Sequence, residues 1–511
     1  MAGISPASQP RMNIVRKRLL VWIPVALLAL FAVLLGRTLL VAPPAPVAPA
    51  AVSEADTFDG EVIARRLAQA LRFRTISWQE GAAPADVDAS QKALVAFRDW
   101  ITTTYPAFSA QASREIVNDY SLLFTWKGSD PVLAPYLLMS HMDVVPIAPG
   151  SEPDWTHPPF AGDIADGFVW GRGTIDTKAG IIGQLEAAEA LIRAGFRPRR
   201  TVMFAFGHDE ETGGQGNARI AALLAERGVR LEFVDDEGGV IVTGAVPGIE
   251  GPVAVVGVAE KGYLTVQLRA HSPGGHSSLP LPIAETAIGR LAQALENLAR
   301  APFEGRIDGV SREFLQQLMP YMSFGQRLAI ANLWLLEPAV VKSMSASPAS
   351  AAILRTSIAP TMVQGGVKEN VLPPSATLTI NLRVHPRDTT ESVLAHIRKA
   401  VDDPQVDISA VGVRREASAV SDMQGPQFAL IRRTLERVKP GVIVAPNLLS
   451  AATDARHYEA LTRNVFRMVP AELTADELKG FHGTNERVPV SSLLLIARYY
   501  RELIRGADGV L

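Results

Sequence analysis

The sequence predicts an α/β fold: a main domain built on a mostly parallel sheet, an inserted α+β module, and one transmembrane helix before both. The 511 residues exceed what one hydrophobic core usually serves, which favours more than one domain. Apolar strand patterns alternate with helical patterns in the first half of the chain, as in parallel α/β sheets. Longer strands of alternating polarity in the middle indicate a second, antiparallel sheet.

The composition excludes several classes of protein. Hydrophobic residues make up 48% and charged residues 20%, a globular balance. Acidic and basic residues nearly cancel, at 52 and 50, so we predict no nucleic-acid partner, which would need a basic excess. Cysteine is absent, which excludes disulfide scaffolds, iron–sulfur clusters, zinc–cysteine sites and cysteine nucleophiles.

The N-terminus carries a membrane signal. Residues 19–35 are an unbroken apolar run, and a membrane span needs about 20 such residues. Four basic residues precede the run, and only Arg37 follows it before Arg65. This asymmetry predicts a membrane anchor with the bulk of the chain extracytoplasmic, in the periplasm or outside the cell.

The predicted N-terminal organisation is a cytoplasmic basic tail at 1–18, a signal anchor at 19–41 and a Pro/Ala-rich linker at 42–56. A cleaved signal peptide is the alternative, although its apolar core is usually only about 7–15 residues long. A buried core helix would not carry four cations on one flank.

The main domain is predicted in two parts, residues 57–260 and 416–511. Within the first part, periodicity predicts helices at 58–71, 90–105, 177–194 and 217–227 and strands at 136–139, 201–206 and 231–234. The glycines after two of these helices are typical helix stops.

The inserted module is predicted at 261–415. Residues 263–270 and 376–384 alternate as half-buried strands do. Helical patterns at 284–298 and 390–401 and a strand at 406–413 complete a sheet with helices on one face. Residues 303–363 are expected to form an extra, mostly helical, apolar insertion.

Acidic and histidine residues follow successive predicted strands. The carboxyl ends of parallel strands share one edge of a sheet, so we expect these side chains to converge there. So many ligands would repel one another without a cation. Nitrogen and oxygen ligands without thiolate suit a pair of zinc ions. The candidates are His141, Asp143, Asp176, Glu210, Glu211, Asp236 and the distant His482.

Their chemistry suggests separate roles. Asp143 lies two residues after His141, on the same side of a strand, and can fix the imidazole tautomer. Asp176 has two oxygens and can bridge two metals. If Glu210 and Glu211 are extended, they point in different directions, so one can ligate while the other takes a proton from water.

These residues lie in segments that resemble the blocks of metallopeptidase family M20, the relatives of carboxypeptidase G, aminoacylase and succinyl-diaminopimelate desuccinylase. The segments include SHMDVVP (140–146), GRGTIDTKAG (171–180), GHDEETGG (207–214), GGHSSLP (274–280) and FHGTNERV (481–488). The block DEGG (236–239) and the long insertion look most similar to the Gly-X carboxypeptidase and N-fatty-acyl-amino-acid hydrolase/synthase branch.

The resemblance implies roles for the metal-site residues. Glu210 would be the general base and Asp143 the residue that orients the histidine. The zinc ligands would be His141, Asp176, Glu211, Asp236 and His482, with Asp176 bridging two zinc ions.

The resemblance also implies that the inserted module is a lid and often a dimerisation surface, so a homodimer is expected. His276 would stabilise the oxyanion, in several relatives across a dimer interface. Asn370 and Arg383 would contact substrate, with Arg383 as a fork for its carboxylate. Two departures touch no ligand: Thr177 stands where many relatives have Asp, and Ala451-Ala452 where many have Gly-Gly.

The expected function is zinc-dependent hydrolysis of an amide next to a free carboxylate, as a carboxypeptidase or N-acyl-amino-acid amidohydrolase. The substrate would be a small N-acyl amino acid or a peptide. One alternative is a two-zinc aminopeptidase or dipeptidase, which would need an acidic group for the substrate amine. Another is a membrane-anchored binding protein on a retired hydrolase fold. The sequence leaves open the acyl length, the oligomeric state and whether the N-terminal segment is cleaved.

Overall fold

The computed structural model describes residues 10–42, 58–79 and 81–509. The predicted linker and the first nine residues of the basic tail lie largely outside these ranges. The first described element is α1 (Pro10–Leu39). Its segment Trp22–Leu39, with a mean hydropathy of 2.0, is the one stretch of the described residues long and apolar enough to cross a membrane.

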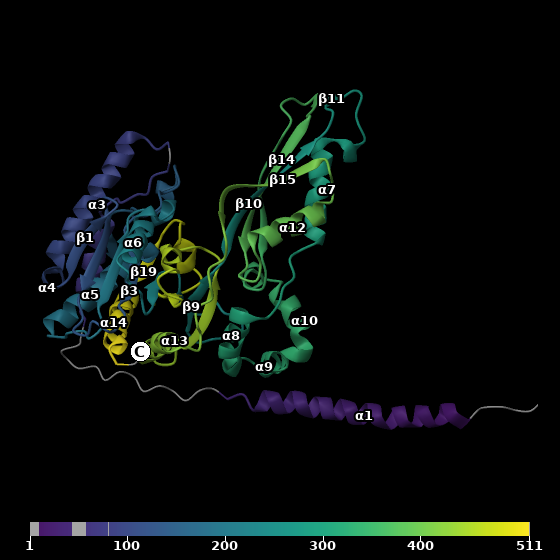
Figure 1. Ribbon diagram of the computed structural model, residues 1–511, viewed down its shortest axis with the longest axis horizontal. Coiled ribbons are helices and arrows are strands. Elements are labelled where there is room, and N and C mark those ends of the chain that lie inside the picture. The colour runs from purple at the N-terminus through teal and green to yellow at the C-terminus, as the bar shows by residue number, and fades with distance from the viewer. Residues whose placement is uncertain (1–9, 43–57, 80, 510–511) are drawn as a thin grey trace, which may run out of the picture.

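The main domain is a three-layer α/β sandwich (Figure 1). Its sheet includes β1 (Ser113–Val117), β2 (Ser121–Trp126), β6 (Val202–Gly207), β3 (Tyr136–His141) and β7 (Val234–Asp236) in that spatial order. It continues through β17 (Val465–Arg467), β9 (Val253–Glu260), β8 (Val240–Val242) and β18 (Glu472–Leu473), and β16 (Ile443–Leu449) also pairs with β9.

The sheet is mixed rather than mostly parallel. β6, β3, β7 and β17 pair in parallel at its centre. β1 and β2 add antiparallel strands at one edge, and β9 runs antiparallel to β17 and β8. β16 and β18 also pair in parallel, with β9 and β8 respectively. The prediction of a mostly parallel sheet therefore holds at the centre and in these two pairs. It is wrong for the antiparallel pairs, because the periodicity of a strand does not indicate its direction.

Helices cover both faces of the sheet because its strands bury side chains alternately on each face. Leu138 of β3 and Phe204 of β6 lie in the same core cluster as residues of α2 (Gly60–Leu71), α5 (Ala179–Arg193) and α14 (Val490–Ala507). Leu137 and Met203, one residue earlier on each strand, pack with α6 (Gln215–Glu226) on the opposite face. This alternation is the period of two expected of a strand.

The remaining helices of the main domain are α3 (Pro84–Thr104), α4 (Pro106–Gln111) and α13 (Pro426–Val438). A small three-stranded sheet of β4 (Asp163–Ala165), β5 (Phe168–Trp170) and β19 (Arg487–Pro489) ties the C-terminal segment to the loop before α5.

A second sheet has the order β12 (Ser357–Gly365), β14 (Ser375–Val384), β10 (Gly262–His271), β15 (Val406–Arg415) and is antiparallel throughout. Its core packs against α7 (Ala287–Arg300) and α12 (Thr390–Val401). At its tip, β11 (Gly275–His276) pairs with β13 (Val371–Leu372).

The segment 303–363 is helical over most of its length, in α8 (Gly309–Leu318), α9 (Phe324–Ala331), α10 (Leu333–Met344) and α11 (Pro348–Ala352). Its last residues are not helical: from Ser357 the chain forms β12, an edge strand of the second sheet. The strand predicted at 231–234 begins only at Val234, as β7. We call α8–α11 the helical insertion; it lies between the second sheet and α1 (Figure 1).

Candidate metal centre

The parallel centre of the sheet brings its polar strand ends to one edge. His141 is the last residue of β3, and Glu210 and Glu211 form the short turn η4 (Glu210–Thr212) just after β6. Asp176 lies in η3 (Thr174–Lys178), the turn that leads into α5. The convergence predicted from strand order is therefore observed for these four side chains.

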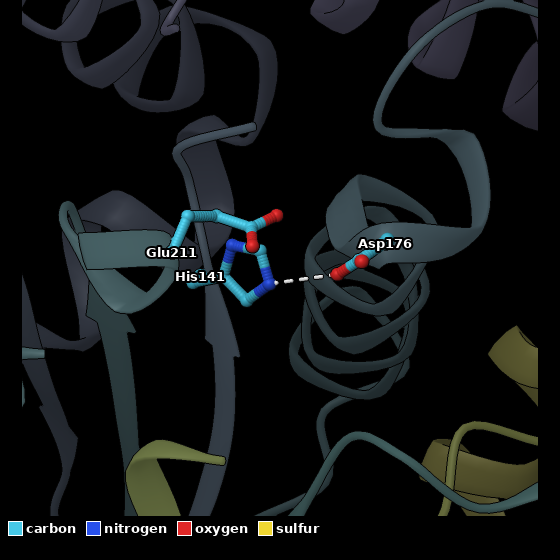
Figure 2. A group of neighbouring side chains, drawn as sticks. All are labelled: His141, Asp176 and Glu211. Carbon is cyan, nitrogen blue, oxygen red and sulfur yellow. Dashed lines mark hydrogen bonds and ion pairs between the residues drawn. The ribbon is translucent and has the colours of Figure 1, made fainter. Parts of the chain in front are cut away.

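Asp176 lies between two imidazoles. Its Oδ1 is 3.0 Å from Nε2 of His141, and its Oδ2 is 3.0 Å from Nε2 of His482. Figure 2 shows His141, Asp176 and Glu211 converging on one point. The second imidazole also lies 3.3 Å from Oε2 of Glu211. A carboxylate with one oxygen directed at each of two ligand groups has the arrangement needed to bridge two metals.

Glu237, not Asp236, faces this cluster. Oε1 of Glu237 lies 3.2 Å from Nε2 of His141. The carboxylate of Asp236 instead accepts a hydrogen bond of 2.9 Å from the backbone N–H of Ala455. The two side chains point to different sides because β7 ends at Asp236, and successive strand residues alternate. Of these two acids, Glu237 rather than the predicted Asp236 lies where it could hold a metal ion together with His141 and Glu210.

Asp143 holds both His141 and the glutamate pair. Its backbone carbonyl accepts from Nδ1 of His141 at 2.9 Å, and its carboxylate lies 3.3 Å from the same nitrogen. The same carboxylate accepts hydrogen bonds of 3.1 Å from the N–H groups of Glu210 and Glu211. Because Nδ1 carries the proton, Nε2 is left to face the acidic cluster.

Glu486 is a positioning residue that the sequence reasoning missed. This buried carboxylate accepts hydrogen bonds of 2.9 Å from the N–H groups of Gly173 and Ile175, on the loop that presents Asp176. It also pairs with Arg172 at 2.7 Å. Its position four residues after His482, in a block already singled out, was a usable signal.

The electrostatics of the cluster follow from burial and mutual repulsion. Burial raises the pKa of Asp176, but hydrogen bonds from His141 and His482 outweigh it and hold that pKa well below its usual range. Hydrogen bonds to Asp176 and Glu211 raise the pKa of His482 to about 10. Burial raises the pKa of Glu237 to about 8, although His141 opposes the shift. At neutral pH, Glu237 and His482 thus carry protons beside the charged Asp176, where dications would otherwise neutralise the site.

The donor set fits metal ions. The ligand atoms of His141, Asp176 and Glu211 lie within 4.8 Å of one another, and so do those of His141, Glu210 and Glu237. Oε1 of Glu211 is buried and has no hydrogen-bond partner among the described residues. Buried polar atoms are rarely left unpaired, so this oxygen is a natural donor to a cation.

The cluster opens into a cavity of about 680 Å³. Its acidic and imidazole end holds Asp176, Glu211 and His482, and its other walls are mostly apolar. The main domain supplies the segment 447–453, while the helical insertion contributes side chains that include Phe314 and Met344.

Arg383, predicted to bind a carboxylate, lies at the rim of this cavity. Its Nη1 donates a hydrogen bond of 3.4 Å to the carbonyl of Ser450, which lines the cavity, and its guanidinium lies 4.8 Å from the ring centre of Tyr263. Burial lowers the pKa of Arg415, and repulsion from Arg456 and Arg383 lowers it further. This group of cations would be stabilised by a substrate anion.

The structure does not bring His276 and Asn370 to the metal centre. His276 is exposed on β11, at the tip of the second sheet and far from β3 (Figure 1). Asn370 is beside it, accepting a hydrogen bond of 3.1 Å from the N–H of Ser277. Within one chain, both predicted roles would require a movement of the inserted module or a second copy of the protein.

Comparison with known proteins assigns this arrangement to a family. The model described as "Peptidase family M20/M25/M40" matches residues 137–506, which include the whole metal centre. The chain belongs to this family. The M20 assignment confirms the resemblance found in the sequence blocks, and it makes the protein a hydrolase.

Relatives and a solved structure agree with this assignment. The chain is 37% identical over 459 residues to "Probable carboxypeptidase S-like 2" of Dictyostelium discoideum, covering 88% of this chain and 86% of the relative. It is 38% identical over 421 residues to human "N-fatty-acyl-amino acid synthase/hydrolase PM20D1", with coverages of 81% and 83%. An M20 family metallo-carboxypeptidase from Sulfolobus solfataricus shares the fold, with a TM-score of 0.61 at 15% identity over 88% of this chain and 99% of that one.

Proposed function

We propose that this M20 hydrolase cleaves the amide bond of N-acyl amino acids, next to their free carboxylate, with two zinc ions. The ligands would be His141, Asp176, Glu211, Glu237 and His482. When bound, the ions would lower the pKa of a water molecule and polarise the amide carbonyl. The observation that carries the proposal is Asp176 placed between two imidazoles at the end of a largely apolar cavity.

Glu210 would serve as the general base. Burial raises its pKa well above the usual value, and Asp454 raises it further. Such a carboxyl group can take a proton from the attacking water and then pass it to the leaving amine. Nη1 of Arg456 lies 3.9 Å from its Oε1 and would keep the side chain in place.

The cations at the rim support a substrate with a free carboxylate. Arg383 and Arg456 are close enough to lower the pKa of Arg415, so an anion between them would relieve repulsion. An aminopeptidase would need an acidic group at this position. The largely apolar remainder of the cavity favours an acyl group on the other side of the scissile amide. The second candidate, a carboxypeptidase acting on peptides, shares the carboxylate site.

Substitution Glu210→Gln tests the assignment of the base. The change keeps the shape of the side chain but removes its ability to accept a proton, so kcat should fall about 10²- to 10⁴-fold. Metal content, measured by atomic emission, should remain at two ions per chain. Glu226→Gln, an exposed change of the same type at the end of α6, should leave kcat unchanged.

Two results would contradict the proposal. Loss of one metal ion from the Glu210→Gln protein would make Glu210 a ligand rather than the base. Wild-type protein that contains two metal ions yet hydrolyses no N-acyl amino acid would refute the substrate class.

We also propose that α1 anchors the protein in a membrane. Large apolar side chains of α1 are exposed, including Trp22, Leu28 and Phe31 at 66%, 70% and 58%. A contiguous apolar surface of this kind is rarely left in water.

A further inference from the structure

The helix α10 of the helical insertion is apolar but mostly uncovered. All but four of its 12 residues are Leu, Trp, Ala, Val or Met, yet Leu333 is the one residue of α10 that is buried. Trp334 and Leu335 are 58% and 43% exposed. A helix as apolar as this normally lies in the core of a protein or in a membrane. The described part of the chain therefore does not give α10 the cover that such a helix normally has.

The exposed side of α10 has the composition of a segment at a membrane interface. The residues exposed along it include Trp334, Leu335, Pro338, Ala339 and Lys342. Their spacing of three and four residues places them on one face of the helix. Tryptophan is enriched at the headgroup level of membranes, and lysine can keep its charge in water while its stem lies among apolar groups. The boundary between lipid and water suits this face better than water alone.

Specific hydrogen bonds hold the start of α10 against the end of α1. Asn332, which is buried just before α10, donates through Nδ2 to the carbonyl of Leu34 at 3.1 Å and to Oγ1 of Thr38 at 3.4 Å. Arg37 donates through Nε to the carbonyl of Ala331, the last residue of α9, at 3.0 Å. These contacts fix the position of α10 relative to α1.

The contact lies close to one end of the apolar segment of α1. This segment is Trp22–Leu39, and the hydrogen bonds are made at Leu34, Arg37 and Thr38. At a rise of about 1.5 Å per residue, Leu34 is about 8 Å from the end of the segment. Helices that lie in a membrane interface bury their apolar face about 5–10 Å deep. A bilayer that surrounds α1 would therefore also reach the start of α10.

We propose that the exposed face of α10 lies in the interface of the membrane that α1 crosses, in the leaflet at the C-terminal end of α1. This inference rests on the proposed anchor and adds a second membrane contact, made by the hydrolase itself. The occupant is lipid rather than a second copy of the chain, because the neighbouring helix α1 is exposed and apolar throughout residues 22–29. The helical insertion would then hold the hydrolase directly against the bilayer.

The absence of cysteine from the chain allows a fluorescent reporter to be placed at one position at a time. Leu335→Cys is labelled with the fluorophore NBD and reconstituted, as the full-length protein, in phosphatidylcholine vesicles. Lipids that carry a doxyl quencher should remove most of its fluorescence, whereas iodide in the buffer should remove little. Trp334→Cys repeats the measurement one residue earlier on the same face.

Two further labelled variants serve as controls. Ile116→Cys is the matched one, because Ile116 is 46% exposed but lies on β1, at the edge of the main sheet and away from the helical insertion (Figure 1). Its label should be quenched by iodide and not by doxyl lipid. Leu28→Cys reports on α1, and doxyl lipid should quench it. A melting temperature equal to that of the wild type shows that each variant is folded.

The quenching pattern separates the second contact from the anchor. If iodide but not doxyl lipid quenches the label at Leu335 while doxyl lipid quenches the one at Leu28, the contact is refuted and the anchor stands. Protection of the Leu335 label from both quenchers would mean that protein covers the face, as in a dimer, and would also refute the contact. Quenching of the Leu28 label by iodide alone would overturn the anchor and this inference with it.

Discussion

Glu237 and Asp236 are adjacent acids with different surroundings. Glu237 faces His141 across 3.2 Å, whereas Asp236 accepts the N–H of Ala455. Sequence reasoning located the DEGG block but assigned the ligand to its first acid. Two adjacent acids at the end of a strand point to opposite sides of it. Periodicity does not determine at which residue a short strand ends, so the sequence could not show which acid faces the cluster.

This pair gives a residue-scale prediction. Glu237→Ala should weaken binding of one metal ion at least about 100-fold, because it removes a ligand. Asp236→Asn keeps an oxygen that can accept from Ala455 and should leave both ions bound. Metal titration monitored by calorimetry measures the two affinities. A loss only in Asp236→Asn would make Asp236 the ligand, and equal losses in both variants would show that the role is not specific to Glu237.

Asp143 and Glu486 show why a site needs more than its ligands. Neither residue lies between two imidazoles as Asp176 does. Asp143 fixes the turn that carries Glu210 and Glu211. Glu486 fixes the loop before Asp176. The first was found because it stands two residues from a histidine. The second was missed because its partners are backbone N–H groups about 310 residues away, which no local pattern reveals.

At the scale of elements, the centre of the sheet could be predicted and its edges could not. β3 and β6 are continuous apolar runs that end in polar residues, and both were found from that pattern. β12 was mistaken for part of a helical insertion because its side chains are largely exposed, which hides the alternation of a strand. Strand direction at the edges depends on pairing between distant segments.

His385, just after β14, gives an element-scale prediction. Burial lowers its pKa to about 4, and Arg387 and Lys261 contribute to the shift while Asp308 and Asp388 oppose it. The folded protein therefore binds fewer protons here than the unfolded chain between pH 6.5 and 4. Stability should fall as the pH drops through this window, by at most about 3 kcal/mol from this group.

His385→Asn isolates the effect of that group. Nδ1 of His385 accepts a hydrogen bond of 3.1 Å from the N–H of Arg387, and an asparagine oxygen can accept from the same i+2 position. The melting temperature of the variant should fall less between pH 7 and pH 5 than that of the wild type. Parallel curves for the two proteins would show that His385 titrates normally.

At the scale of the whole molecule, the helical insertion connects three parts of the protein. It lines the cavity of the metal centre, follows α7 of the second sheet module, and contacts α1 through α9. Nε of Arg37 donates to the carbonyl of Ala331 at 3.0 Å, and Nδ2 of Asn332 donates to the carbonyl of Leu34 at 3.1 Å. The same helix α9 contributes Ala329 and Ile330 to a second cavity, of about 530 Å³, inside the helical insertion. The apolar helix α1 thus packs against the helical insertion.

This contact leads to a prediction about the anchor. The full-length protein should sediment with membranes and be released by detergent but not by about 1 M salt, because apolar burial rather than charge would hold it. A chain lacking residues 1–41 should be soluble and hydrolyse N-acetyl-leucine with unchanged kcat/KM, since α1 contributes no side chain to the metal-centre cavity. A full-length chain that stays in solution with an intact N-terminus would contradict the anchor.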